Sequence, residues 1–240
     1  ALNPRDSDAY FYTGLIYTRL KQDEKAIKGY NKVIELSPKD VDAHYNRGLN
    51  YSHLKQDERA IQDFSKAIEL DPEGADIYGS RGFSYAILKQ YDKAIEDYSK
   101  AIELDPESAD AYYDRGGEYS EQGQHDKAIQ DFSKAIELDP ESADIYNNRG
   151  FSYSILKQYD KAIKDYNKAM ELDSEYFYPY KNLARFNVVH GNYESALENI
   201  KKALSLQPKI QYKALVLYYE FIAKKLLGMD TAKCEAALNE

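Results

Sequence analysis

Apolar residues recur along the chain at intervals of three and four residues, and short polar stretches interrupt them at regular places. Residues 75–88 read "ADIYGSRGFSYAIL" and residues 91–104 read "YDKAIEDYSKAIEL". Each segment places its apolar residues on one face of a helix. Only the dipeptide "KQ" separates the two, which is typical of a turn between antiparallel helices. The pattern therefore predicts an all-α protein built from pairs of antiparallel helices.

The helix-pair pattern returns every 34 residues, as the spacing of the prolines shows. Pro4, Pro38, Pro72, Pro106 and Pro140 are followed at the same interval by Ser174 and Pro208. A fixed period of this length predicts stacked supersecondary repeats, because one helix pair cannot bury its apolar face alone. We expect six repeats, at residues 7–40, 41–74, 75–108, 109–142, 143–176 and 177–210.

The two ends of the chain extend this repeat pattern. Residues 1–6 align with the end of a second helix, so we expect them to be the tail of a preceding repeat and the chain to be a fragment of a longer protein. Residues 211–228 should form a C-terminal capping helix, with Ala214, Leu217, Tyr218 and Phe221 at first-helix positions. Residues 229–240 should form a short terminal helix or tail that Asp230 or Thr231 begins.

Small residues stand at two fixed places in each repeat. The eighth position holds Gly14, Gly48, Gly82, Gly116, Gly150 and then Ala184, although a helical glycine costs about 1 kcal/mol relative to alanine. The twentieth position holds Ala26, Ala60, Ala94, Ala128, Ala162 and Ala196. We expect the two backbones to approach closely at these small residues, with the recurring tyrosines and phenylalanines filling the space above and below.

This set of positions, an aromatic residue, then glycine, tyrosine, alanine, a second aromatic residue, alanine and proline, resembles the tetratricopeptide repeat. The resemblance covers nearly the whole chain. It implies a right-handed superhelical solenoid of stacked antiparallel helix pairs, in which the first helices line a concave groove. The seventh position, where the family usually has leucine, holds Arg47, Arg81, Arg115 and Arg149. We expect these arginines to pair with neighbouring carboxylates while their stems cover apolar surface. The sixth repeat has Asn187 and Ile200 where aromatic residues are usual.

Candidate binding residues are those groove positions on the first helices that repeat packing does not use. Aromatic and aliphatic side chains there have the area and rigidity of interface anchors, and asparagine amides can both donate to and accept from a peptide backbone. Gly79 and Gly117 would leave room for a ligand. The predicted partner-binding residues are Tyr45, Asn46, Leu49, Phe83, Tyr113, Asn148, Phe151 and Lys181.

Two recurring polar features of the groove have competing explanations. Asp8, Asp42, Asp76, Asp110 and Asp144 could select basic partners, but each lies in a helical first turn, often after a capping Ser7, Ser108 or Ser142. Local stabilisation of the helix end explains the row by itself. Asn46, Asn148 and Asn182 resemble an asparagine ladder that holds an extended peptide in some family members. The basic residues by which chaperone-binding members clamp a terminal carboxylate are missing, so we expect no tight binding of such a tail.

Composition narrows the functional classes. The chain has 41 acidic and 32 basic residues, a net charge of -9, which disfavours nucleic acid as a partner. One cysteine permits no internal disulfide, and the four histidines lie at four different repeat positions, so we expect no metal, no cofactor and no catalytic site. The most apolar stretch, 214–223, is too short to span a membrane. The single cysteine and the lack of a visible signal sequence favour the cytoplasm.

These observations predict a non-catalytic protein–protein interaction scaffold that holds a segment of a partner in its concave groove. The aspartates at groove positions favour a partner with apolar anchors and some basic residues. Lys181 and Arg185 could instead bind an acidic group of a partner. Self-association through the solenoid ends, a targeting arm of a larger enzyme, and RNA recognition are the remaining alternatives.

Overall fold

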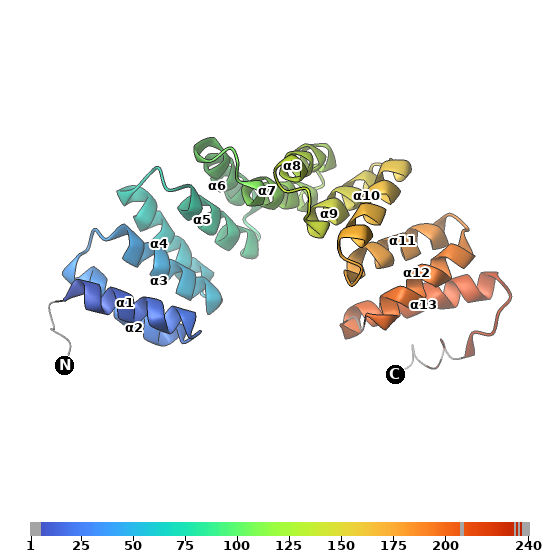
Figure 1. Ribbon diagram of the computed structural model, residues 1–240, viewed down its shortest axis with the longest axis horizontal. Helices are drawn as coiled ribbons and strands as arrows, with labels where there is room; N and C mark the ends of the chain where they lie inside the picture. The colour runs from blue at the N-terminus through green and yellow to red at the C-terminus, as the bar shows by residue number, and fades with distance from the viewer. Residues whose placement is uncertain (1–5, 207–208, 233, 235, 237–240) are drawn as a thin grey trace. The chain divides into compact units, whose positions relative to one another are not determined.

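The computed structural model describes residues 6–206, 209–232, 234 and 236. Within these residues the regular secondary structure is α-helical, as expected (Figure 1). Of residues 1–6 only Asp6 is described, so the expected helix tail lies outside the described residues, as do parts of 229–240. The helices are α1 (Ser7–Arg19), α2 (Asp23–Leu36), α3 (Val41–His53), α4 (Asp57–Leu70), α5 (Ala75–Ile87), α6 (Tyr91–Leu104), α7 (Ala109–Glu121), α8 (His125–Leu138), α9 (Ala143–Ile155), α10 (Tyr159–Leu172), α11 (Phe177–Val189), α12 (Tyr193–Ser205) and α13 (Ile210–Leu226).

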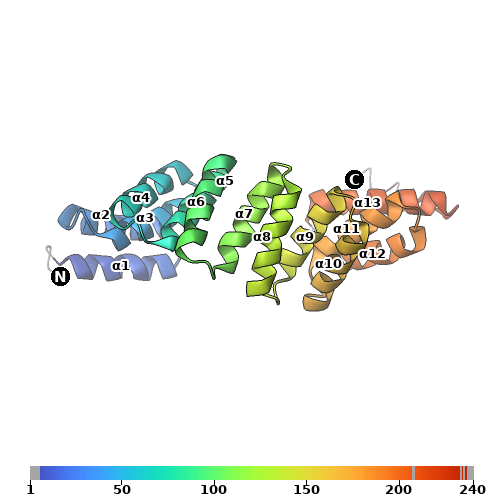
Figure 2. The ribbon, with the colours of Figure 1, turned by 90° about the horizontal axis from the view of Figure 1, so that it is seen from above.

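The helices form two compact bodies, an N-terminal body of residues Ala1–Gln124 and a C-terminal body of residues His125–Glu240. In the N-terminal body the antiparallel pairs α1–α2, α3–α4 and α5–α6 stack one on the next, and α7 packs against α5 and α6 (Figure 2). In the C-terminal body α8 packs on α9, and the pairs α9–α10 and α11–α12 follow in the same manner.

The last helix, α13, packs against α11 and α12 of the C-terminal body. Val216 and Ala223 are fully buried there beside Ala184, Ile200 and other apolar residues. Of the four residues assigned to first-helix positions, Leu217 is buried, whereas Ala214 is exposed and half of Tyr218 is exposed. The buried stripe of α13 is centred on Val216 and Ala223.

The turn inside each pair closes with the same hydrogen bonds. At the end of α1, the Gln22 amide donates to the Tyr17 carbonyl (2.9 Å) and the Lys21 amide donates to the Thr18 carbonyl (2.9 Å), which is the Schellman pattern. This pattern needs a left-handed residue, and Lys21 has φ of 54°. Lysines occupy three equivalent turns (Lys55, Lys89 and Lys157), and Gly123 and Gly191 occupy two others.

The helical glycines allow the first helix of a pair to lie directly on an aromatic ring. A Cβ added to Gly48 would lie 2.7 Å from Phe64 Cε1, and one added to Gly14 would lie 2.7 Å from Tyr30 Cε1. Both rings are fully buried. The close approach expected at the eighth position is confirmed, but the ring of the second helix, rather than the small alanine at the twentieth position, is its nearest neighbour.

The N-termini of α1, α3 and α7 are capped by the side chain of the short polar residue that precedes the helix. Asp6 accepts from the Ala9 amide (3.0 Å) and Asp40 accepts from the Ala43 amide (2.8 Å). Ser108 accepts from the Ala111 amide (3.3 Å), as predicted. Ser7 is not a cap, because α1 begins at Ser7 itself, and Ser142 stands at the cap position without a side-chain hydrogen bond.

The seventh-position arginines pair with carboxylates, which confirms the sequence-based expectation. Arg81 donates from Nε and Nη2 to both oxygens of Asp97 (2.8 and 2.7 Å), and its Nη1 donates to Ser65 Oγ of the preceding pair (3.1 Å). Arg149 repeats this arrangement with Asp165 and Ser133. Burial raises the pKa of Asp97, and the Arg81 hydrogen bonds oppose that rise. These bidentate pairs therefore stabilise the fold within and between helix pairs.

Candidate partner-binding surfaces

Two adjoining pockets in the N-terminal body form one surface, which we call the acidic groove. One pocket of about 240 Å³ extends from Tyr45 to Asp114, and a second of about 290 Å³ lies beside it and is lined by Leu49 and Phe83. The two share Gly79, Ser80 and Asp114. A Cβ added to Gly79 would have nothing within 4 Å, so the missing side chain leaves open space in the wall.

Carboxylates dominate the polar lining of the acidic groove. The first pocket is lined by Asp76, Asp105, Asp110 and Asp114 and by no lysine or arginine. None of these four carboxylates forms an ion pair with another described residue. Burial raises the pKa of Asp114 to about 6, and the negative charge of Asp110 adds to the rise. The groove therefore carries uncompensated negative charge and favours a cation.

Glu118 lies one helical turn after Asp114 on α7 and adds a further, partly buried carboxyl group to this helix. Its Oε2 atom is buried and has no hydrogen-bond partner in the described part of the chain. Burial raises the pKa of Glu118 to about 7, with Glu121 and Asp114 as secondary causes. In α5 and α9 the equivalent position holds Ser84 and Ser152, which are fully buried. A carboxyl group thus stands where a small hydroxyl is found in neighbouring pairs.

Three of the predicted binding residues of the N-terminal body line the acidic groove. The Tyr45 hydroxyl lies 3.4 Å from Ser80 Oγ, Leu49 packs against the core around Phe64, and Phe83 is 49% exposed. Asn46 and Tyr113 line neither pocket. The Asn46 amide donates to the Asp42 carbonyl of its own helix (2.8 Å).

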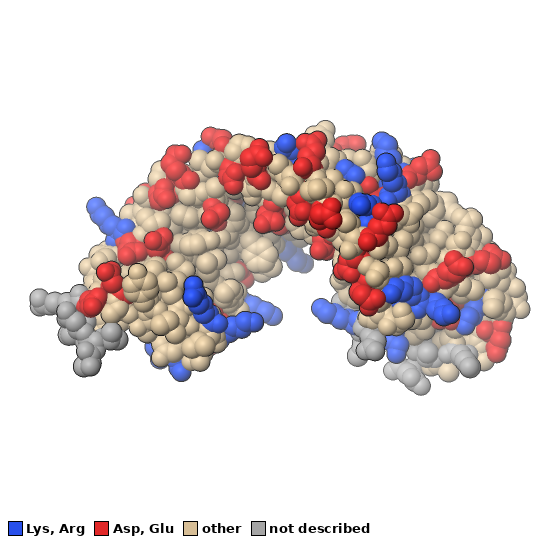
Figure 3. Space-filling view, in the orientation of Figure 1, with Lys and Arg blue, Asp and Glu red and all other residues tan. Residues whose placement is uncertain are grey.

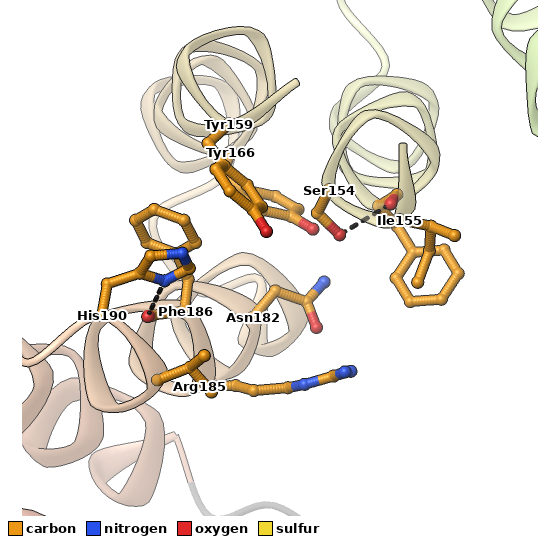
Figure 4. A pocket seen from close by; sticks show the side chains of 10 residues that line it. Ser154, Ile155, Tyr159, Tyr166, Asn182, Arg185, Phe186 and His190 are labelled. Atoms are coloured by element: carbon orange, nitrogen blue, oxygen red, sulfur yellow. Dashed lines mark hydrogen bonds between the residues drawn. The ribbon is translucent and has the colours of Figure 1, made fainter. Parts of the chain in front are cut away.

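A third pocket, which we call the basic pocket, lies in the C-terminal body between α9, α10 and α11 (Figure 4). It has a volume of about 120 Å³. Its aromatic wall is tightly packed, with the Phe186 and His190 rings stacked at 4.1 Å and the Tyr159 ring 4.7 Å from His190. The ten lining residues include no aspartate or glutamate and are Phe151, Ser154, Ile155, Tyr159, Tyr166, Asn182, Arg185, Phe186, Val189 and His190.

Arg185 gives the basic pocket its charge, and Lys181 is a second cation on the same helix, outside the lining of the pocket. Arg185 is exposed and its side chain projects from α11 toward α9, beside Asn182 (Figure 4). Lys181, one turn earlier, lies over the Tyr178 and Tyr212 rings (5.2 and 5.6 Å from the ring centroids). Neither cation forms an ion pair with another described residue. Burial lowers the pKa of Lys181, and the charge of Arg185 lowers it further.

The predicted residues of the C-terminal body are only partly brought together. Phe151 lines the basic pocket, whereas Asn148 and Lys181 do not. The Asn182 amide donates to Asn147 Oδ1 (3.1 Å), and the Asn147 amide donates to Asn148 Oδ1 (3.1 Å). Two members of the expected asparagine ladder are therefore connected through a third asparagine, which holds their amides in fixed orientations.

Some lining residues escaped the sequence-based list. Tyr159 and His190 lie at the turn between helices rather than at groove positions, and the 34-residue pattern marks neither of them. Asp114 stands at the repeat position that holds Asn46, Asn148 and Asn182 in other repeats. An aspartate instead of an asparagine at this position, one helical turn after Asp110, is the sequence feature that indicates concentrated negative charge.

Charge is distributed unevenly over the surface of the molecule. On the face drawn in Figure 3, acidic side chains are numerous over α5, α6 and α7, whereas lysine and arginine side chains gather over α12 and α13. The described residues contain no group of three His, Cys, Asp or Glu side chains that could hold a metal ion. Among the described helices, none combines the length and the apolar character that a membrane span requires.

Comparisons with known proteins place this geometry in a family. Tetratricopeptide-repeat models match residues 41–73, 75–108, 98–130 and 143–176, and a TPR repeat model matches residues 14–55 and 116–156. A comparison with curated protein sequences gave no match.

Solved structures give the same result. A crystal structure of MamA is 30% identical, with a TM-score of 0.65, and the match covers 67% of this chain and 94% of that one. MamA from Desulfovibrio magneticus RS-1 is 25% identical, with a TM-score of 0.68, over 72% of this chain and 98% of that one. YrrB, described as a TPR protein with an unusual peptide-binding site, is 25% identical over 74% of this chain and 91% of that one, with a TM-score of 0.65. This chain belongs to the tetratricopeptide-repeat family and has the fold of a protein-interaction scaffold.

Proposed function

We propose that the chain is a non-catalytic scaffold whose acidic groove holds an extended segment of a partner protein. The observation that carries this proposal is the open space at Gly79, in a groove lined by the exposed Phe83 ring, by Leu49 and by four carboxylates that form no ion pair with another described residue. A partner segment with apolar anchors and one or more lysine or arginine side chains complements such a surface. The peptide-binding site named for YrrB supports the same class of function.

Leu49 and Phe83 are the proposed apolar contacts of the partner. Phe83 is 49% exposed although it is large and apolar, and burying it on binding would contribute favourable free energy. The Tyr45 hydroxyl and Ser80 would orient the peptide backbone by hydrogen bonds. Asn46, Tyr113, Asn148, Phe151 and Lys181 remain proposed contacts along the concave surface of their own bodies.

Selection of binders from a random peptide library tests this proposal. We expect the enriched peptides to combine apolar and basic residues and to bind the chain measurably in fluorescence anisotropy. Gly79→Leu should weaken that binding at least tenfold, because the new side chain fills the open space without touching the core. Gly79→Ala is the matched control, because it makes the same helical change with far less volume.

The acidity of Asp114 gives an independent readout. Its carboxyl group, with a pKa of about 6, loses its proton between pH 5 and pH 7, so a basic peptide should bind more tightly at pH 7.5 than at pH 5. Asp114→Asn should reduce this pH dependence. Enrichment of acidic peptides alone, or an affinity that Gly79→Leu leaves unchanged, would contradict the proposal.

Self-association is a second candidate function, because the first and last helices each expose apolar side chains. Tyr12, Ile16 and Leu20 lie one turn apart at the end of the N-terminal body and are 57–64% exposed. Tyr218 and Leu226 are 50% and 57% exposed on α13. Light scattering over a range of concentrations should detect growth of the particle, and Ile16→Ser combined with Leu226→Ser should prevent it. A constant monomeric mass would exclude this candidate.

A further inference from the structure

The basic pocket has a chemistry opposite to that of the acidic groove, which is visible in its side chains. Four aspartates and no cation line one pocket of the acidic groove, whereas the basic pocket contains Arg185 and no carboxylate. Lys181 stands one helical turn from Arg185, and the two side chains repel each other. A ligand that suits one surface is therefore unsuited to the other.

The cations of α11 differ from the structural arginines of the same body. Arg149 forms two hydrogen bonds to Asp165, 2.7 and 2.9 Å long, so its charge is neutralised within the fold. Arg185 has no such partner among the described residues, and Lys181 is half-buried over the Tyr178 and Tyr212 rings and forms no ion pair with another described residue. Two like charges one turn apart, one of them partly desolvated, favour an anion between or beside them.

The volume of the pocket limits the size of the ligand side chain that can bind beside that anion. Its volume of about 120 Å³ is slightly below the roughly 150 Å³ of a cavity that holds benzene, so an aliphatic side chain of the size of leucine fits better than an aromatic one. Val189 and Ile155 remain 71% and 41% exposed at this pocket and would be covered by such a side chain.

Asn182 adds a polar contact with a fixed orientation. Its Nδ2 atom donates to Asn147 Oδ1 (3.1 Å), which leaves the Asn182 carbonyl oxygen available to accept from a peptide amide. In Figure 4 the Asn182 and Arg185 side chains lie together below Ser154 and Ile155, so backbone contact, charge and apolar wall share one opening.

We propose that the basic pocket is a second peptide-binding site, which takes a leucine-sized aliphatic residue and an adjacent aspartate or glutamate side chain from a partner protein. The aliphatic residue contacts Ile155, Phe186 and Val189. The carboxylate binds Arg185 and Lys181. This site lies wholly within the C-terminal body and is independent of the acidic groove.

Synthetic peptides test this proposal with the intact chain. The probes are fluorescein-labelled ten-residue peptides of glycine and serine that carry one leucine and one glutamate, spaced one to four residues apart. Their N-termini are labelled and their C-termini amidated, so the glutamate provides the only carboxylate of the peptide itself, and the carboxylate of the fluorescein is the same in every probe. We expect saturable anisotropy changes for at least one spacing, and a loss of about tenfold in affinity when glutamine replaces the glutamate or alanine the leucine.

Variants of the chain locate the site. Arg185→Gln and Lys181→Gln should each weaken binding several-fold, and Lys201→Gln, which removes an equal charge from an exposed position on α12, should not. Charge reversal gives a gain of function: Arg185→Glu should bind a peptide with lysine in place of glutamate better than the unmodified chain does. Circular dichroism and urea midpoints establish that each variant is folded.

The outcomes separate this proposal from that for the acidic groove. Gly79→Leu should leave binding of the acidic peptides unchanged. The basic pocket is refuted as a peptide site if no acidic peptide binds saturably, if the glutamine peptides bind equally well, or if Arg185→Gln and Lys181→Gln have no effect. None of these results tests whether basic peptides bind the acidic groove.

Discussion

The acidic groove and the basic pocket are built on the same helix-pair scaffold but carry opposite charge. Beneath both surfaces, a seventh-position arginine is neutralised by a buried aspartate, Arg81 by Asp97 in one body and Arg149 by Asp165 in the other. The charges that differ, those of Asp114 and Arg185, are on the first helices and lack ion-pair partners among the described residues. The ion pairs that stabilise the fold are therefore repeated in both bodies. The charges without an ion-pair partner, which a ligand could bind, differ from one first helix to another.

The repeated ion pairs should have the largest effect on stability, and an equal one in the two bodies. Arg81→Ala and Arg149→Ala each leave a buried aspartate without its partner, so we expect each to lower the free energy of unfolding by about 3 kcal/mol. Urea denaturation followed by circular dichroism measures both. Arg59→Ala, which removes an exposed arginine, is the control. A clear difference between the two losses in free energy of unfolding would show that the two ion pairs do not stabilise their bodies equally.

Replacement by alanine should destabilise the chain at a glycine with a close neighbour and stabilise it at a glycine without one. Gly48→Ala brings a methyl group to 2.7 Å from the buried Phe64 ring, and we expect a net loss of about 1–2 kcal/mol. Gly79→Ala meets no atom within 4 Å, so helix propensity should make it more stable by about 0.5–1 kcal/mol. The same urea experiment applies. Destabilisation by Gly79→Ala would mean that the groove is not open at this point.

Glu118 should make stability depend on pH. Its pKa in the folded chain, about 7, lies above its ordinary value, so the protonated form is favoured on folding. This contribution is complete at low pH and is lost as the pH rises through 7. We expect Glu118→Gln to be more stable than the unmodified chain by about 1 kcal/mol at pH 8, allowing for solvent screening, and to match it at pH 4.

Urea midpoints from pH 4 to pH 8 measure the effect of Glu118, with Glu198→Gln as the control, because Glu198 is an exposed carboxylate on α12 of the other body. Parallel pH profiles for the unmodified chain and Glu118→Gln would show that the carboxyl group is not held in an unfavourable environment.

The turns should give the smallest effect. Lys89 and Lys157 have φ of 57° and 59°, a conformation that costs a side-chain-bearing residue about 1 kcal/mol. Lys89→Gly and Lys157→Gly should each stabilise the chain by about 0.5 kcal/mol in thermal or urea unfolding. Lys100→Gly lies within α6 and should destabilise it. Equal losses at all three positions would contradict the explanation from backbone geometry.

The sequence predicted the fold class well because the packing signals are repeated. The segments expected to be helical at residues 75–88 and 91–104 are α5 (Ala75–Ile87) and α6 (Tyr91–Leu104), and the arginine–carboxylate pairing follows from residues that recur at fixed intervals. The burial pattern of α13 was harder to predict. That helix has no further helix pair beyond it among the described residues, and Tyr218 is half exposed there.

The candidate sites were harder to predict, because they depend on side chains that do not repeat. Tyr45, Leu49 and Phe83 could be selected from their helical positions, but the raised pKa of Asp114 depends on burial, which periodicity does not reveal. Tyr159 is the first residue of α10, and His190 directly follows the last residue of α11. Their meeting with Phe186 depends on how successive pairs stack, and a single sequence does not specify that distance.

The arginine pairs also bear on how the scaffold opens. Arg81 binds Asp97 within its own helix pair and Ser65 in the preceding one, so the preceding pair cannot unfold alone without breaking this contact. The helices α1 and α11 have Thr13 and Leu183 at the corresponding position. Nearest-neighbour coupling of this kind makes an array of helix pairs unfold cooperatively where coupling is strong and fray where it is weak. Amide hydrogen exchange should therefore be fastest in α1 and α11–α13, and slowest in α4–α6 and α10.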